Sequence, residues 1–283
     1  MKTQNKQIVR YFALTFLISW VLWSPFYFDG EVNELWALPG AWGPTIAALV
    51  LTAYDNGKKG VKKLLKRLLI FKVPFKYYLF AVFAILLCAL IAIALYTIFV
   101  DIPLDYGVIV EGMGLERDQW GLAFLLAPLF FVINTLLGGP IAEELGWRGY
   151  AQERLQQQYS LRVSGVVIGL LWALWHLPLL WRLPKAVGNI PLLAYIPLLT
   201  AMGVIFAWLY QRTKGSVLLA ILFHGGFNFT MGFLGADLFT SKNLLFIQVA
   251  LIILLAVVLV RRNSDESHTK IDRHIITSKS NKK

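Results

Sequence analysis

Polar side chains interrupt three apolar runs in the second half of this 283-residue chain. They are two carboxylates, a guanidinium, two imidazoles and an amide, at Glu143, Glu144, Arg148, His176, His224 and Asn228. An ionisable group on a spanning helix costs at least about 2.5 to 3.5 kcal/mol at the bilayer centre, so such residues are candidates for function. As a set they are suited to hydrolysis by an activated water. A carboxylate serves as general base, an imidazole orients the water or protonates a leaving amine, and amide or imidazole groups donate to the oxyanion.

Helical spacing gives the two adjacent carboxylates different partners. Neighbouring residues on a helix diverge by about 100°, so Glu143 and Glu144 cannot face the same way. Glu144 precedes Arg148 by four residues, which is the favourable order for an ion pair. Glu143 is thereby left for another task. The alternative is an ordinary charge cluster at a helix end.

The two histidines stand in different surroundings. His176 follows a wholly apolar run, four residues after Trp172 and two before Pro178, which can kink the helix there. A histidine alone on an apolar face is usually a packed core residue, and Trp172, one turn earlier, is expected to pack rather than to take part in the chemistry. His224 and Asn228 share a helical face at a spacing of four. The two glycines between them permit close approach of a neighbouring helix or a substrate.

A metal site is an alternative use of the same groups. Glu143, His176 and His224 make a competent zinc set that leaves one position for water. The chain has no His-Glu-x-x-His, the signature common in metalloproteases.

The composition indicates that lipid surrounds most of the chain. Hydrophobic side chains make up 58% of it and charged ones only 15%, a balance too apolar for a soluble domain of this size. A spanning helix needs about 20 apolar residues. Eight segments approach or reach that length: 8–28, 35–54, 77–100, 120–142, 163–181, 190–210, 216–234 and 244–260. We predict an all-α polytopic membrane protein with about eight transmembrane helices in one domain, 1–260.

Lysine and arginine predict the orientation. With the N-terminus inside, the inward segments hold 23 of the 27 basic residues, and basic segments are retained on the cytoplasmic side. Both termini are therefore expected to be cytoplasmic. Topology accounts for the net charge of +11, and no nucleic-acid partner is expected.

Two segments are basic for most of their length. Residues 57–76 place cations and leucines at helical spacing, which suits an interfacial helix on anionic lipid. A basic loop that only fixes topology is the alternative. Residues 261–283 are polar, charged and poor in aromatic side chains, so we predict a disordered, basic cytoplasmic tail.

In chain order, the three polar motifs resemble those of the CPBP family, which comprises the type II CAAX prenyl endopeptidases and bacterial relatives of the Abi or bacteriocin-immunity type. The motifs are Glu-Glu-x-x-x-Arg, aromatic-x-x-x-His and His-x-x-x-Asn, and they begin at Glu143, Trp172 and His224. They fall on three successive apolar segments and span about a third of the chain. Trp172 stands where the family usually has phenylalanine, which implies a reshaped cavity wall.

The resemblance implies a CAAX-protease-like bundle of eight helices with its catalytic core at about 120–235 and a water-filled cavity opening within the membrane. By analogy, Glu143 would activate water together with His176. His224 and Asn228 would stabilise the oxyanion.

The same resemblance implies that Glu144 and Arg148 hold the helix of the first glutamate in place. Family members have been described both as metalloproteases and as metal-independent glutamate proteases. We favour the second description and no cofactor, because an asparagine and an arginine suit oxyanion and supporting roles better than zinc ligation.

The sequence leaves alternatives for the substrate and for the functional class of the protein. The prenylated CAAX substrate belongs to eukaryotic members, whereas this short, lysine-rich chain is typical of a bacterial cell membrane. Its expected substrate is therefore a membrane-embedded protein or a hydrophobic peptide. One alternative is a noncatalytic immunity or scaffold protein of the same fold. Another is a transporter, but transport predicts polar residues in both halves of the bundle, and here they cluster between Glu143 and Asn228.

Overall fold

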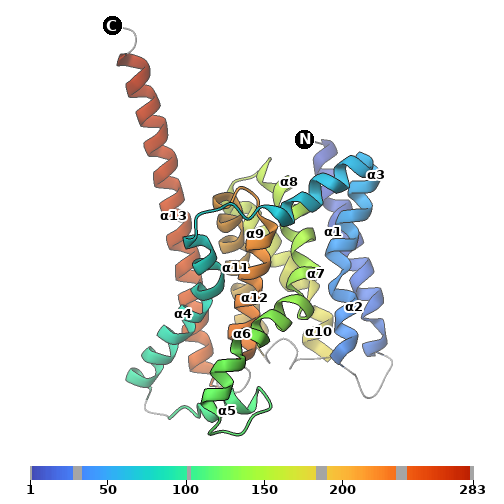
Figure 1. Ribbon diagram of the computed structural model, residues 1–283. Coiled ribbons are helices and arrows are strands. Elements are labelled where there is room, and N and C mark those ends of the chain that lie inside the picture. The colour runs from blue at the N-terminus through green and yellow to red at the C-terminus, as the bar shows by residue number, and fades with distance from the viewer. Residues whose placement is uncertain (1, 28–33, 101–102, 183–189, 234–240, 281–283) are drawn as a thin grey trace.

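A computed structural model of the protein describes residues 2–27, 34–100, 103–182, 190–233 and 241–280. Every element within these residues is helical (Figure 1), which confirms the predicted all-α class. In chain order the elements are α1 (Lys2–Leu22), η1 (Ser24–Tyr27), η2 (Glu34–Trp36), α2 (Ala37–Ala41), α3 (Gly43–Leu65), η3 (Lys66–Leu69), α4 (Lys76–Phe99), α5 (Gly107–Glu111), α6 (Trp120–Leu137), α7 (Pro140–Glu144), η4 (Leu145–Gln152), α8 (Glu153–Gln156), α9 (Leu161–Trp175), α10 (Leu177–Arg182), α11 (Leu192–Arg212), α12 (Val217–Phe233) and α13 (Lys242–Ser280).

Several of these helices are apolar enough for a lipid environment. Four stretches are long and apolar enough to cross a membrane: Lys76–Phe99, Trp120–Gln156, Leu192–Arg212 and Lys242–Arg261. Two apolar helices are shorter, Leu161–Trp175 and Val217–Gly232. The first two predicted spans, 8–28 and 35–54, overlap α1 and α3, which are polar at one end and are not among these four stretches. The chain is therefore an integral membrane protein of several long apolar helices.

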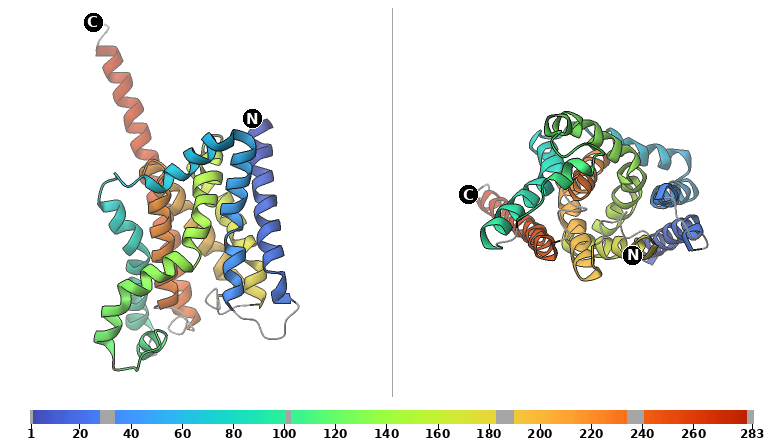
Figure 2. Two further views of the ribbon diagram at one scale, coloured as in Figure 1. Left: turned by 45° about the vertical axis from the view of Figure 1, so that its right-hand side comes forward. Right: turned by 90° about the horizontal axis from the view of Figure 1, so that it is seen from below.

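Both termini lie at the same end of the bundle, as Figures 1 and 2 show. The short helices α5 and α10 lie at the opposite end. This arrangement is the one that an even number of crossings requires.

Close backbone contact joins α9 to α11. A side chain added at Gly169 would lie 2.6 Å from the Cα of Thr200, and one at Gly203 would lie 2.4 Å from the carbonyl oxygen of Gly165. Gly165 and Gly169 form a Gly-x-x-x-Gly pair, which lets helix backbones approach each other. This contact fixes the helix that ends at His176.

The two glycines between the third pair of polar residues serve helix packing. A side chain at Gly225 would collide with Thr135 of α6, at 2.2 Å from its hydroxyl oxygen. One at Gly226 would lie 2.7 Å from the carbonyl oxygen of Ala81 in α4. Of the two predicted uses, the approach of neighbouring helices is the one observed, so α12 is held against α4 and α6.

One residue in the count of inward charges is misplaced. The 23 basic residues include Arg148, but all eight residues of the π-helix Leu145–Gln152 are buried. The chain turns at Gly139, whose φ of 107° is a conformation that favours glycine, and α7 then enters the bundle. Arg148 is basic but paired in the interior, so its charge does not mark a cytoplasmic loop.

The basic segment after Gly57 is helical, as predicted. Gly57 has φ 59° and ψ −163°, which kinks α3. The part of α3 beyond the kink runs across the end of the bundle where the termini lie (Figure 1). Its contact with anionic lipid stays a prediction.

The described part of the tail continues α13 to Ser280, and residues 281–283 lie outside the described part. The disorder of residues 261–283 stays a prediction. The cytoplasmic placement of the tail stays a prediction.

Candidate active site

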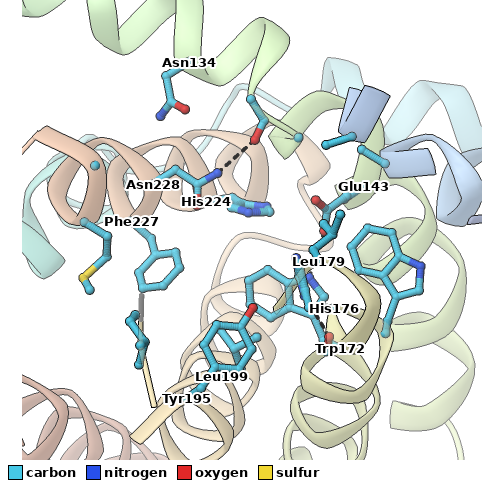
Figure 3. Close-up of a pocket in the computed structure, with 18 of the residues that line it drawn as sticks. Asn134, Glu143, Trp172, His176, Leu179, Tyr195, Leu199, His224, Phe227 and Asn228 are labelled. Carbon is cyan, nitrogen blue, oxygen red and sulfur yellow. Dashed lines mark hydrogen bonds between the residues drawn. The ribbon is translucent and has the colours of Figure 1, made fainter. Parts of the chain in front are cut away.

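A cavity of about 360 Å³ lies where the three polar motifs meet. Its wall holds the predicted catalytic and wall residues, which Figure 3 shows around one space: Glu143, Trp172, His176, His224 and Asn228. The other two predicted residues, Glu144 and Arg148, do not line the cavity and are fully buried. The structure thus brings together side chains from α7, α9 and α12.

Two indole groups hold the Glu143 carboxylate. Its Oε2 accepts a hydrogen bond from Nε1 of Trp147 at 3.1 Å and another from Nε1 of Trp172 at 2.8 Å. The other oxygen, Oε1, lies beside Gly139, where an added side-chain carbon would stand 2.7 Å from it. Glu143 is 4% exposed, so these donors replace much of the water that a carboxylate needs.

Glu144 joins two of the motifs behind the cavity. Its Oε2 accepts from Nε of Arg148 at 2.9 Å, which confirms the predicted ion pair. Its Oε1 accepts from Nδ1 of His224 at 2.8 Å. The guanidinium of Arg148 also lies over the Phe206 ring, at 3.9 Å from its centroid. Removing one partner of such a buried pair typically costs about 3–5 kcal/mol.

The hydrogen bonds fix which nitrogen of each histidine carries a proton. Nδ1 of His176 lies 2.9 Å from the carbonyl oxygen of Trp172, and a carbonyl only accepts, so this nitrogen donates. Nδ1 of His224 donates to Glu144 by the same reasoning. In each ring Nε2 is left for the cavity. It accepts a hydrogen bond when the ring is neutral and donates one when the ring is charged.

Amides and a phenol complete the wall. Nδ2 of Asn228 donates to the carbonyl oxygen of Gly138 at 3.1 Å, and its second proton is left for another acceptor. Asn134 and Tyr195 also line the cavity. Sequence reasoning missed both, although Asn134 stands inside an apolar helix and is marked by the same criterion that singled out the histidines.

The described side chains form no ready metal cluster. Within the described residues, no three His, Cys, Asp or Glu side chains are grouped so as to hold a metal ion. The zinc set considered above, Glu143, His176 and His224, lines one cavity. Oε2 of Glu143 already accepts from two N–H donors, which leaves Oε1 as its oxygen for a ligand.

Fold and site together define a class: a helical membrane protein with a buried carboxylate, two imidazoles and an amide around an internal cavity. Residues 125–230 match the family described as type II CAAX prenyl endopeptidase Rce1-like. The chain is also similar to CAAX prenyl protease 2 of Methanococcus maripaludis, with 29% identity over 227 residues, 76% of this chain and 80% of the relative. These matches confirm the resemblance drawn from the three motifs, and they indicate a peptidase similar to the Rce1-like proteins.

Proposed function

We propose that the protein is an intramembrane endopeptidase in which Glu143 activates the hydrolytic water. The observation that carries this proposal is the burial of the Glu143 carboxylate in a cavity wall that also holds both histidines. A base in this position accepts a proton as the water attacks a peptide carbonyl carbon. In the neutral ring of His176, Nε2 accepts a hydrogen bond from the same water and so orients it.

The oxyanion is stabilised from α12. Asn228 supplies an amide proton, and His224 supplies an Nε2 proton when its ring is charged. The Glu144 carboxylate accepts from Nδ1 and so holds the ring with Nε2 toward the cavity. Collapse of the tetrahedral intermediate then needs one proton for the leaving amine, and protonated Glu143 holds the proton taken from water.

The reaction needs no metal in this proposal. Glu143 is the base that deprotonates the attacking water, so a metal-bound hydroxide is not required. Asn228 and His224 take the place of a Lewis acid at the oxyanion. The donor arrangement described above supports this choice over the zinc alternative.

The substrate is a membrane-embedded protein or a hydrophobic peptide. The similar archaeal protein is named a CAAX prenyl protease, and whether this chain uses prenylated substrates is a separate question. Aromatic and aliphatic side chains form most of the cavity wall, among them Trp175, Tyr195, Leu199 and Phe227. Such a wall favours apolar side chains next to the bond that is cut.

We further propose that the protein resides in a bacterial cell membrane with both termini in the cytoplasm. Of the 23 basic residues counted on the inward segments, all except the buried Arg148 support this orientation. Anionic lipid on the same face would contact the basic residues of 57–76.

Glu143→Gln tests the proposed function, because glutamine keeps the shape of the side chain but cannot take up the proton. Membrane proteomes are compared between a deletion strain and strains that carry the wild type, Glu143→Gln or the control Glu116→Gln, whose side chain is exposed. We expect a substrate fragment with the wild type and the control but not with Glu143→Gln. A phenotype that survives Glu143→Gln at normal expression would instead support the noncatalytic immunity or scaffold class.

A further inference from the structure

The cavity wall is buried on one side and reaches exposed residues on another. On the inner side lie the buried π-helix Leu145–Gln152 and the ion pair of Glu144 with Arg148. Away from them the wall continues to a group of residues that we call the cavity mouth: Trp23, Leu38, Ala41, Leu179, Ile190 and Gly232. Leu38 and Gly232 are the exposed members of this group, and the rings and aliphatic groups of Trp23, Leu179 and Ile190 are buried behind them. These residues follow α1, lie in α2 and α10, precede α11 or lie near the end of α12.

The cavity mouth and the termini are at opposite ends of the bundle. α1 begins at the end with both termini and runs away from it, and α10 lies at the far end (Figures 1 and 2). Since Trp23 directly follows α1 and Leu179 lies in α10, the mouth belongs to the far end.

The two ends of the bundle differ in charge. The end with the termini carries the start of α1, the basic part of α3 and the Arg212 end of α11. The segments predicted to face inward hold 23 of the 27 basic residues, of which Arg148 is buried and paired with Glu144. At the far end, the acidic side chains of Asp105 and Glu111 form ion pairs with Arg117. Basic segments stay in the cytoplasm, so the far end faces outward.

We infer that the cavity opens on the extracytoplasmic side of the membrane and takes an apolar peptide segment presented there. The identity of the peptide as a substrate rests on the proposed function, whereas the side of access rests only on the cavity and the charges. Within the described lining residues, Glu143 is the one acid and none is lysine or arginine. The mouth residues are aromatic, aliphatic or glycine, so they favour an apolar segment over a charged chain end.

Cysteine labelling in intact cells tests the side of access without requiring catalysis. Cys88, buried in α4 and the one native cysteine, is replaced by alanine. Single cysteines are then placed at the mouth, by Leu38→Cys and Gly232→Cys, and at the basic end, by Asn56→Cys. Leu38 is 36% exposed, Asn56 is exposed, and open space surrounds Gly232.

We expect a membrane-impermeant maleimide to label both mouth cysteines in intact cells and to label Asn56→Cys only after permeabilisation. The reverse pattern overturns the inference. So does a mouth that stays unlabelled after permeabilisation while Asn56→Cys reacts, because the cavity is then closed to water.

A second experiment tests whether the peptide enters through the cavity mouth. Once a cleavage product is known, each variant is compared with itself before and after external labelling. Modification of Gly232→Cys should lower cleavage more than tenfold, and treatment of intact Asn56→Cys cells should leave it unchanged. External labelling without loss of cleavage shows that the peptide enters elsewhere and overturns the route. Absence of cleavage before labelling counts against the proposed peptidase function instead, and the labelling pattern still decides the side of access.

Discussion

At the scale of single residues, the arrangement around Glu143 combines contacts that follow from sequence spacing with others that do not. The pair of Glu144 and Arg148 lies on one stretch of chain, so a spacing of four predicts it. The indole of Trp172 reaches Glu143 from another helix, 29 positions along the chain. Sequence reasoning took Trp172 for a wall residue alone, because no local pattern tells which neighbour a ring will meet.

Trp172→Phe keeps an aromatic ring in the wall and removes the N–H that donates to Glu143. A hydrogen bond to a charged group contributes about 1.5–3 kcal/mol, so we expect the cleavage rate to fall about 10- to 100-fold. The matched control is Trp181→Phe, whose side chain is 83% exposed. Rates are compared in purified protein of equal thermal stability. An unchanged rate for Trp172→Phe would show that the indole does not position the base.

The pH dependence of kcat/KM belongs to the same scale. Activity should fall at acidic pH, because protonated Glu143 cannot accept a proton from water. Glu144 and Arg148 carry charge behind the cavity. Activity is therefore expected to rise with pH along an acid limb, and the residual activity of Glu143→Gln should lose this dependence. A profile flat down to strongly acidic pH contradicts the role of Glu143.

At the scale of elements, helix contacts decide where the imidazoles stand. Periodicity and apolar runs predicted α9, α11 and α12, and the glycines of α12 suggested close packing. The contact of Gly165 and Gly169 with α11 was not predicted, since a Gly-x-x-x-Gly pair does not identify its partner helix. The inward turn of α7 was also missed, because a rule based on basic residues cannot tell a buried, paired Arg148 from one in a loop.

Gly169→Val tests whether the α9 to α11 contact positions His176. A side chain there meets backbone atoms of Leu199 and Thr200 at 2.6 Å, so the helices must separate. Overpacking typically costs about 1–3 kcal/mol, and we expect a lower midpoint of thermal unfolding in detergent together with lower cleavage. Leu170→Val, at a position 40% exposed, should change neither. Normal stability and cleavage in Gly169→Val would show that the contact is not needed.

At the scale of the whole molecule, composition predicted the membrane class and charge predicted that both termini share one end. Both predictions depend on averages over many residues, and so they survive errors at single positions. The cavity could not be predicted in this way, because its volume depends on side chains from seven helices and on how they tilt. Sequence could name the residues on three of those helices but not the space between them.

The basic end should recruit anionic lipid. A polar groove of about 500 Å³ there is lined by Lys59 and Lys63, while its Arg67 is already paired with Glu153. A lysine near an anionic surface contributes about 1 kcal/mol, which is about a fivefold effect. Lys59→Gln with Lys63→Gln should therefore reduce the enrichment of phosphatidylglycerol over phosphatidylcholine around the protein in mixed-lipid nanodiscs. Lys242→Gln, at the other end, should leave it unchanged. Equal enrichment in all three proteins would support a basic segment that only fixes topology.

Cleavage of the identified substrate by purified, metal-stripped protein tests the central claim most directly. If Glu143 itself activates the water, the stripped wild type should keep its full rate without added zinc. Glu143→Gln should lose at least about 100-fold, as expected for removal of a general base. A stripped wild type that is inactive until zinc is restored, or a Glu143→Gln variant as active as the wild type, would contradict the account.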